Sequence, residues 1–177
     1  MSLAEAREPD RGVTAERLRS AMGHFATGVT VVSAISHDGI PYGSTANAVS
    51  SLSLEPPLVL VCLRRASATL AVLLDTGRFA LNILDAGQEA LARRFAHTAK
   101  GLGWSGVEHR PGVSGVPLIV SALAKIEADV YQLADGGDHR IVIGRVLEVE
   151  HPAEHVEPLL FYRGAYAGLT PPGWPGA

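Results

Sequence analysis

Hydrophobic residues alternate with polar ones along several stretches of the chain, as they do in strands that bury one face. The stretch 140–150 is an example, because Ile141, Ile143, Leu147 and Val149 all fall on alternating positions. By the same reasoning we predict strands at 29–35, from 42 onward, and at 58–63, 79–84, 118–133, 140–150 and 159–162.

Short polar turns rich in glycine and aspartate separate these predicted strands. The segment 37–39, His-Asp-Gly, lies between the first two strands, and the segment 134–138 joins the two longest ones. Turns of this length connect antiparallel neighbours. Many strands joined by hairpins, with few helices, therefore predict a closed antiparallel β-barrel.

The first helical pattern lies near the N-terminus. Leu18, Met22 and Phe25 recur at helical spacing, and Thr14 is a suitable N-cap ahead of them. We expect this helix to deliver Phe25 to the core and to end before Gly28, where the first strand follows.

Two further short helices are marked by their capping residues. Ser67 is an N-cap for one of them, and Gly77 is placed to end it. Asp85 and Gln88, three residues apart, have the spacing of a capping box for the other, which carries Phe95 on its apolar face.

Length and charge limit the possible functions. The 177 residues suit one domain, for which we expect a folded part at 14–169 between flexible ends at 1–13 and 170–177. A net charge of -3 disfavours binding to nucleic acid or to an anionic membrane surface. No apolar run approaches the roughly 20 residues that span a bilayer, and no signal peptide is evident, so we expect a cytoplasmic protein. The single cysteine, Cys62, excludes a disulfide within the chain and a thiolate metal cluster, and we expect no metal.

The segment 43–57 is unusually dense in small hydroxyl and amide side chains, and it lies between two apolar stretches. Such residues can line a site with backbone N–H groups and short donors at almost no steric cost. This favours a binding wall for a planar heteroaromatic ligand that carries a phosphate. A barrel strand whose hydroxyl groups are satisfied by the backbone is the alternative.

Two patterns match known motifs but lack the surroundings that those motifs require. Residues 101–106 have the spacing G-x-G-x-x-G, yet no strand leads into them and no helix follows. Residues 151–155 read H-x-x-E-H, but Pro152 is compatible only with the first turn of a helix. We interpret the first as a loop and the second as a polar connection between strands. No catalytic triad and no pair of carboxylates is recognisable.

Five segments of the chain, in order, resemble the short-chain flavin reductases, NAD(P)H-dependent components that hand reduced flavin to a separate monooxygenase. The segments are 25–32, 44–57, 79–82, 137–139 and 158–164, and the resemblance covers roughly residues 18–169. It implies a mostly β fold, the antiparallel, Greek-key-like FMN-binding split β-barrel with a few short helices. It also implies a homodimer with flavin near the subunit interface.

The same resemblance implies which residues bind the ligands, with FMN or FAD as the flavin and NADH, the family's commoner choice, or NADPH as the co-substrate. For the flavin they are Thr27, Gly28, Val29, Thr30, Ser44, Thr45, Ala46, Asn47, Ala48, Ser50, Ser51, Ser67, Arg94 and Phe95. The pair Arg64-Arg65 is another possible phosphate partner. For the nicotinamide nucleotide they are His139, Tyr162, Arg163 and Gly164.

Hydride transfer from nicotinamide to flavin needs stacking and alignment more than a proton-transferring side chain, so we expect no catalytic residue of that kind. The resulting hypothesis is an NAD(P)H:flavin oxidoreductase that supplies reduced flavin to a partner monooxygenase. The alternative is a flavin-binding electron carrier without pyridine-nucleotide reductase activity.

Overall fold

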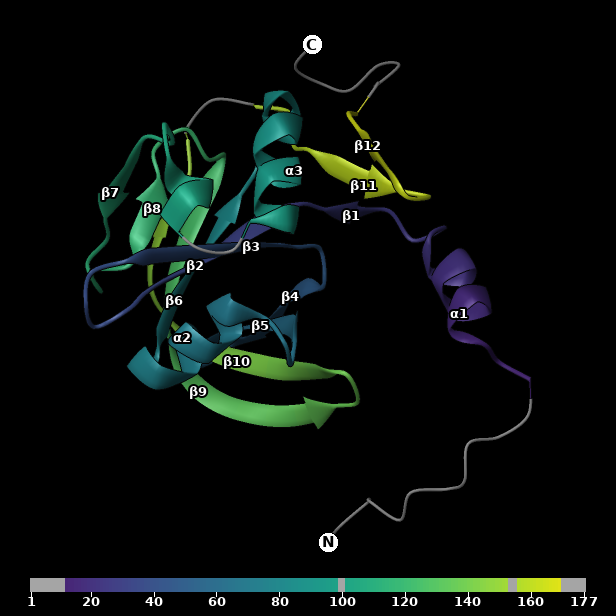
Figure 1. Cartoon of the computed structure of the whole chain (residues 1–177), viewed down its shortest axis with the longest axis horizontal. Coiled ribbons are helices and arrows are strands. Elements are labelled where there is room, and N and C mark those ends of the chain that lie inside the picture. The colour runs from purple at the N-terminus through teal and green to yellow at the C-terminus, as the bar shows by residue number, and fades with distance from the viewer. Residues whose placement is uncertain (1–11, 99–100, 153–155, 170–177) are drawn as a thin grey trace, which may run out of the picture.

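A curved antiparallel sheet of seven strands forms the body of the protein, in a computed structural model that describes residues 12–98, 101–152 and 156–169. Figure 1 shows the strands wrapping around a common core. Their order across the sheet is β3-β2-β6-β9-β10-β5-β4. The bounds are β2 (Thr30–Ile35), β3 (Pro41–Ala46), β4 (Val49–Leu54), β5 (Pro57–Arg64), β6 (Arg78–Ile83), β9 (Ala124–Gly136) and β10 (His139–Glu150).

The sheet closes because its two edge strands, β3 and β4, are separated in the chain only by Asn47 and Ala48. The Cys62 N–H donates to the Ala48 carbonyl at 2.9 Å, which ties this connection to β5. Strands that are far apart in the sheet order are thus neighbours in space, as a barrel requires. The predicted mostly β split-barrel class is confirmed.

Two small sheets and a set of short helices complete the fold. One sheet contains β1 (Thr27–Gly28), β11 (Leu160–Tyr162) and β12 (Ala165–Ala167), and the other contains β7 (His109–Pro111) and β8 (Pro117–Ile119). The helices are α1 (Ala15–Met22), α2 (Ala68–Thr76) and α3 (Glu89–His97), with 3₁₀ turns η1 (Ala86–Gln88) and η2 (Gly101–Trp104). Within the described ranges, no helix is both long enough and apolar enough to cross a bilayer.

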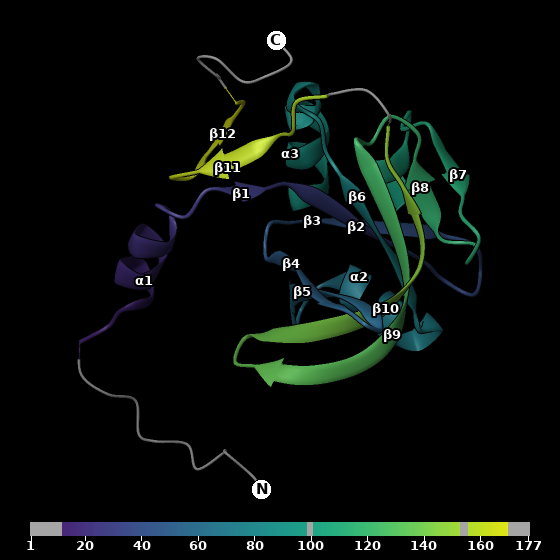
Figure 2. The same cartoon turned by 180° about the vertical axis from the view of Figure 1, so that it is seen from behind.

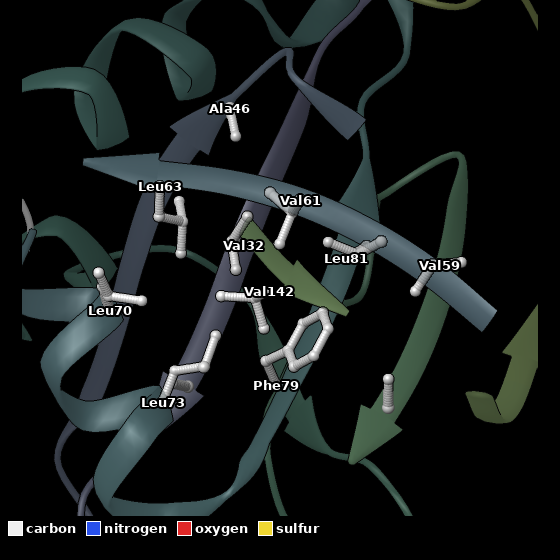
Figure 3. Close-up of a cluster of buried hydrophobic side chains, with 12 residues drawn as sticks. Val32, Ala46, Val59, Val61, Leu63, Leu70, Leu73, Phe79, Leu81 and Val142 are labelled. Carbon is white, nitrogen blue, oxygen red and sulfur yellow. The ribbon is translucent and has the colours of Figure 1, made fainter. Parts of the chain in front are cut away.

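The inward face of the sheet supplies the main core (Figure 3). Val32, Val61, Phe79 and Leu81 are fully buried there beneath α2. Close packing depends on Gly144 in β10, because a Cβ at this position would lie 2.5 Å from the Phe79 ring. Alternation separates core positions from outward ones along β5, whereas β2 and β6 are buried on both faces.

The capping predictions for α2 and α3 are confirmed. The Ser67 hydroxyl accepts a hydrogen bond from the Leu70 N–H, and Gly77 ends α2 in the left-handed conformation with φ 72°. Asp85 and Gln88 form the reciprocal capping box, on the 3₁₀ turn that leads into α3. Local capping chemistry thus fixes both ends of α2 and the start of α3.

Two predictions of extent are wrong. The expected single strand 118–133 is divided into β8 and β9 by a turn at Val120–Ser121, and the expected loop 97–116 contains η2 and β7. The sequence is apolar up to the turn at Val120–Ser121, so its hydrophobic pattern does not show where β8 ends. The end of β8 is fixed by a residue of β6, since the Ile119 N–H donates to the buried Asn82 side chain at 2.8 Å.

The first helix also differs from expectation. It begins after the predicted cap Thr14 but ends at Met22, and Phe25 is 67% exposed instead of lying in the core. Figures 1 and 2 show α1 standing away from the barrel, beyond the short strand β1. The predicted helix is confirmed, but no part of the described chain covers the apolar face of α1.

Candidate functional site

A cavity of about 710 Å³ opens between the sheet of β1 and β11 and the strands β4 and β5. Four segments form most of its walls: the end of α1 and the residues after it, strand β1, residues 47–50, and the outward face of β5. Thr30 of β2 and Ile83 of β6 complete them. The lining residues are Met22, Phe25, Ala26, Thr27, Gly28, Thr30, Asn47, Ala48, Val49, Ser50, Leu60, Cys62 and Ile83.

The alternation of β5 places two different side-chain sets on its two faces. Val59, Val61 and Leu63 are buried in the core, whereas Leu60 and Cys62 point outward and line the cavity. Since successive side chains of a strand point to opposite faces, one strand supports the fold and the site together.

Cys62 behaves as a small apolar wall residue. Partial burial raises the pKa of its thiol above the ordinary value, because desolvation disfavours the thiolate. The group therefore stays protonated at neutral pH, and it contributes apolar surface to the cavity.

Thr27 places an unpaired hydroxyl group at the cavity. Its Oγ1 atom is buried and has no hydrogen-bond partner among the described residues. A buried hydroxyl without a partner costs about 1–3 kcal/mol. A ligand that offers a donor or acceptor at this point would offset that cost.

The predicted flavin-binding residues divide into two groups in the structure. Thr27, Gly28, Thr30, Asn47, Ala48 and Ser50 lie together around the cavity. The others, which are Val29, Ser44, Thr45, Ala46, Ser51, Ser67, Arg94 and Phe95, do not line it. The structure thus brings together the β1 residues and the connection between β3 and β4.

Several residues of the second group have other contacts. Val29, Ala46 and Phe95 are buried in the core. The Thr45 hydroxyl donates to the Ala92 carbonyl at 2.6 Å and so ties β3 to α3. Arg94 donates to the Ser105 carbonyl at 2.8 Å.

Ser44 and Ser67 belong to a separate hydroxyl cluster at the start of α2. The Ser44 hydroxyl donates to Thr69 Oγ1 at 2.8 Å and lies 3.3 Å from the Ser67 hydroxyl. Ser51 is exposed next to Ser50 on β4. The Ser44 and Ser67 hydroxyls have partners within the protein, and neither residue lines the cavity.

The residues predicted to meet the nicotinamide nucleotide lie on two hairpins. His139 begins β10, and its Nδ1 atom is 2.7 Å from the Asp138 carboxylate. This hydrogen bond holds the pKa of Asp138 below its usual value. The other three residues lie at the hairpin between β11 and β12, beside the end of α1.

Arg65 is paired within the protein. Its guanidinium donates to Asp135 at 3.0 Å and to the Gly137 carbonyl at 2.8 Å, and Arg140 also pairs with Asp135. The hydrogen bond from Arg65 and the charge of Arg140 lower the pKa of Asp135. These ion pairs fix the turn end of the β9–β10 hairpin, where His139 lies.

The sequence did not identify the apolar wall of the cavity. Met22, Phe25, Leu60 and Cys62 are lining residues that were assigned to the core or to no site. The alternation of β5 was visible, but which of its faces meets a ligand depends on the curvature of the sheet. The apolar spacing of Leu18, Met22 and Phe25 was the other sequence feature that pointed to this wall.

Comparison with known proteins agrees with the fold and the cavity. The family model described as the flavin reductase like domain matches residues 22–170. This match spans most of the chain and all four segments that line the cavity. The chain belongs to the flavin reductase family.

Relatives in this family cover most of the chain. A Mycobacterium tuberculosis protein, the reductase subunit HsaB of a flavin-dependent monooxygenase, is 40% identical over 86% of this chain and 81% of its own length. A flavin reductase (NADH) from Kitasatospora aureofaciens is 41% identical over 88% of this chain and 82% of its own length. The Streptomyces globisporus NADH:FAD oxidoreductase SgcE6, solved in complex with NAD and FAD fragments, has a TM-score of 0.82 at 36% identity, covering 92% and 99% of the two chains.

The cavity of this flavin reductase family member fits a flavin in size and chemistry. Small-molecule sites typically occupy about 300–1,000 Å³ and combine apolar walls with a few polar groups. Here the apolar side chains of Phe25, Leu60 and Cys62 accompany the unpaired Thr27 hydroxyl and the Ser50 hydroxyl. Such a combination suits a flat ring system with polar edges.

Proposed function

We propose that this chain is an NADH-dependent flavin reductase that supplies reduced flavin to a separate monooxygenase. The observation that carries this function is the cavity, where Asn47 and Ser50, together with the β1 segment, face an apolar wall. Relatives at about 40% identity are named as an NADH flavin reductase and as the reductase subunit of a flavin-dependent monooxygenase. A reductase fed by NADH works where that nucleotide is held, so we place the protein in the cytoplasm.

The cavity residues act by binding and orientation. Flavin, when bound, accepts a hydride from reduced nicotinamide. Thr27, Asn47 and Ser50 would hold its polar edges, while Leu60 and Phe25 pack against the ring and exclude water. Holding two reactants in line can supply much of the lowering of the barrier. No acid or base side chain is required for this step.

For the nicotinamide nucleotide we propose His139 from one side and the hairpin of Tyr162, Arg163 and Gly164 from the other. Both hairpins lie at the open end of the barrel, on the side where α1 stands (Figure 1). FMN and FAD are both candidate flavins, since the cavity is open enough for a ligand to extend out of it.

A homodimer would complete this open end. Leu18 and Met22 on α1, together with Phe25 just after it, form an apolar stripe that no part of the described chain covers. Ile141 and Ile143 of β10 pair with Cys62 and Leu60 on the outward face of the sheet, so this face is also apolar. The family resemblance implies a homodimer with flavin near the subunit interface, and we propose that α1 of one copy packs on the other copy beside the cavity.

Adjacent serines on β4 test the flavin site directly. Ser50 lines the cavity and Ser51 is exposed outside it. We expect Ser50→Leu to weaken FMN and FAD binding by about tenfold or more, because it fills the cavity and removes a hydroxyl oxygen that can accept a hydrogen bond from the ligand. Ser51→Leu is the matched control and should leave flavin affinity within about twofold. Equal effects of the two substitutions in a fluorescence titration would contradict the placement of the site.

A further inference from the structure

Arg163 occupies a backbone conformation that arginine disfavours. Among the described residues it is the one residue other than glycine with positive φ, at 50°. It precedes Gly164, with φ 81°, in the two-residue turn between β11 and β12. Turns of this kind favour asparagine followed by glycine, because asparagine enters the left-handed region more readily than other side chains. An arginine here is not explained by the needs of the backbone.

Contacts with Gly23, at the C-terminal end of α1, fix the position of this turn. The Arg163 N–H donates to the Gly23 carbonyl at 2.8 Å. A Cβ at Gly23 would lie 3.5 Å from the Arg163 Cα, so the two backbones are in direct contact. Met22, directly before Gly23, and Phe25, two residues after it, line the cavity. The turn is therefore held at the rim of the proposed flavin site.

The side chain of Arg163 is free to take a ligand. It is exposed, and no carboxylate of the described chain pairs with it. In contrast, Arg65 and Arg140 share Asp135, and Arg110 pairs with Glu150. Residues in sparsely populated backbone conformations cluster at ligand sites, and the unpaired guanidinium leaves its charge available to a ligand.

We infer that the Arg163 guanidinium binds the pyrophosphate of the pyridine nucleotide. This inference rests on the proposed function and adds the recognised group. A guanidinium matches phosphate oxygens with two parallel hydrogen bonds and stays charged at any working pH. The flavin also carries phosphate, but Arg163 does not line the cavity proposed for the flavin and lies at its rim, where a second ligand would approach. The nucleotide is thus the partner that the turn favours.

Arg163→Asn tests this inference, because asparagine suits the turn and lacks the charge. We expect KM for NADH to rise about tenfold, the loss of a hydrogen bond to a charged group, with kcat within about twofold. A hydride donor without phosphate, 1-benzyl-1,4-dihydronicotinamide, should be oxidised at the wild-type rate. Arg163→Lys should restore part of the NADH affinity. Arg78→Gln removes an equal charge on β6, where Arg78 pairs with Asp129 at 3.6 Å, and should leave KM unchanged.

Other outcomes have distinct meanings. Equal losses with NADH and with the phosphate-free donor would overturn the inference, because they would indicate a structural role of the turn. If Arg163→Asn lowered the affinity for FMN but not for riboflavin, the guanidinium would bind the flavin phosphate instead, and the inference would be wrong. Unaltered KM in Arg163→Asn contradicts this inference alone, whereas a wild-type protein that cannot reduce flavin with NADH contradicts the proposed function. The variant should unfold at the wild-type temperature or above, since its backbone is less strained.

Discussion

Helices α1 and α3 carry the same kind of sequence pattern and have opposite surroundings. Both follow a side-chain cap and present apolar residues on one face. α3 buries Phe95 in the core, whereas Leu18 and Met22 of α1 are each 56% exposed. Periodicity therefore identifies a helix and its apolar face, but it does not say which surface covers that face.

The difference comes from what lies opposite each helix. Phe95 packs against Gly43 of β3, where a Cβ would lie 2.7 Å from the ring, so the barrel has a space shaped for α3. No strand of the described chain offers such a space to α1. The apolar face of α1 is instead available to the ligand site and to a second copy.

Replacement of one phenylalanine in each segment gives the largest expected contrast. Phe95→Ala should lower the free energy of unfolding by about 3–5 kcal/mol, because it leaves a cavity in the core. Phe25→Ala should cost no more than about 0.5 kcal/mol within one copy, since the side chain is exposed. Urea unfolding at several protein concentrations checks both values. The Phe95→Ala loss should not depend on concentration, and a similar loss in both variants would contradict the contrast.

A charged residue on the apolar stripe of α1 tests whether a second copy of the chain covers this helix. Leu18→Glu should weaken self-association by about tenfold or more, because it places a carboxylate in an apolar contact. Ser20→Glu, on the opposite face of the same helix, is the control. Sedimentation velocity measures the shift from dimer to monomer. A wild-type protein that is monomeric at all concentrations would show that the stripe has another purpose.

Phe25 should also contribute to flavin affinity, whereas exposed apolar residues outside the cavity should not. It lines the cavity, so Phe25→Ala should weaken flavin binding by about fivefold through lost apolar contact. Leu54→Ala is the control, because Leu54 is 87% exposed and lies outside the cavity. Fluorescence titration with FMN and FAD measures both. Unchanged affinity in Phe25→Ala would remove α1 from the site.

The thiol of Cys62 reports on the outward face of β5 with the smallest expected effect. Because burial raises its pKa, iodoacetamide should modify the folded protein more slowly than the unfolded chain near pH 8, and the rate should continue to rise at higher pH. Saturating FMN should slow the modification a further two- to threefold, as roughly expected for a partly covered wall residue. Mass spectrometry measures the extent of modification. Equal rates with and without FMN would place the flavin elsewhere.

Features set by neighbouring residues could be predicted from the sequence. The caps Ser67 and Asp85 and the stop Gly77 act within one turn of the chain, and each is confirmed. The break between β8 and β9 could not be predicted, because it depends on Asn82, a residue of another strand. Elements that depend on distant contacts carry no local signal.

The candidate site shows the same division. Its polar wall was visible as part of the hydroxyl-rich segment 43–57, which includes Asn47 and Ser50. Its apolar wall was not, since Leu60 and Cys62 reach the cavity only through the curvature of β5. The Thr27 hydroxyl was predicted from family resemblance, but that it lacks a partner is a property of the folded chain alone.

Anaerobic stopped-flow absorbance tests the central claim most directly. The purified protein is mixed with FMN or FAD and then with NADH or NADPH, and the band of oxidised flavin is followed. We predict rapid bleaching with NADH for at least one flavin, and strong slowing of it in Ser50→Leu. Flavin that binds to the protein but keeps its oxidised absorbance with both nucleotides would contradict the reductase function, and would favour an electron carrier.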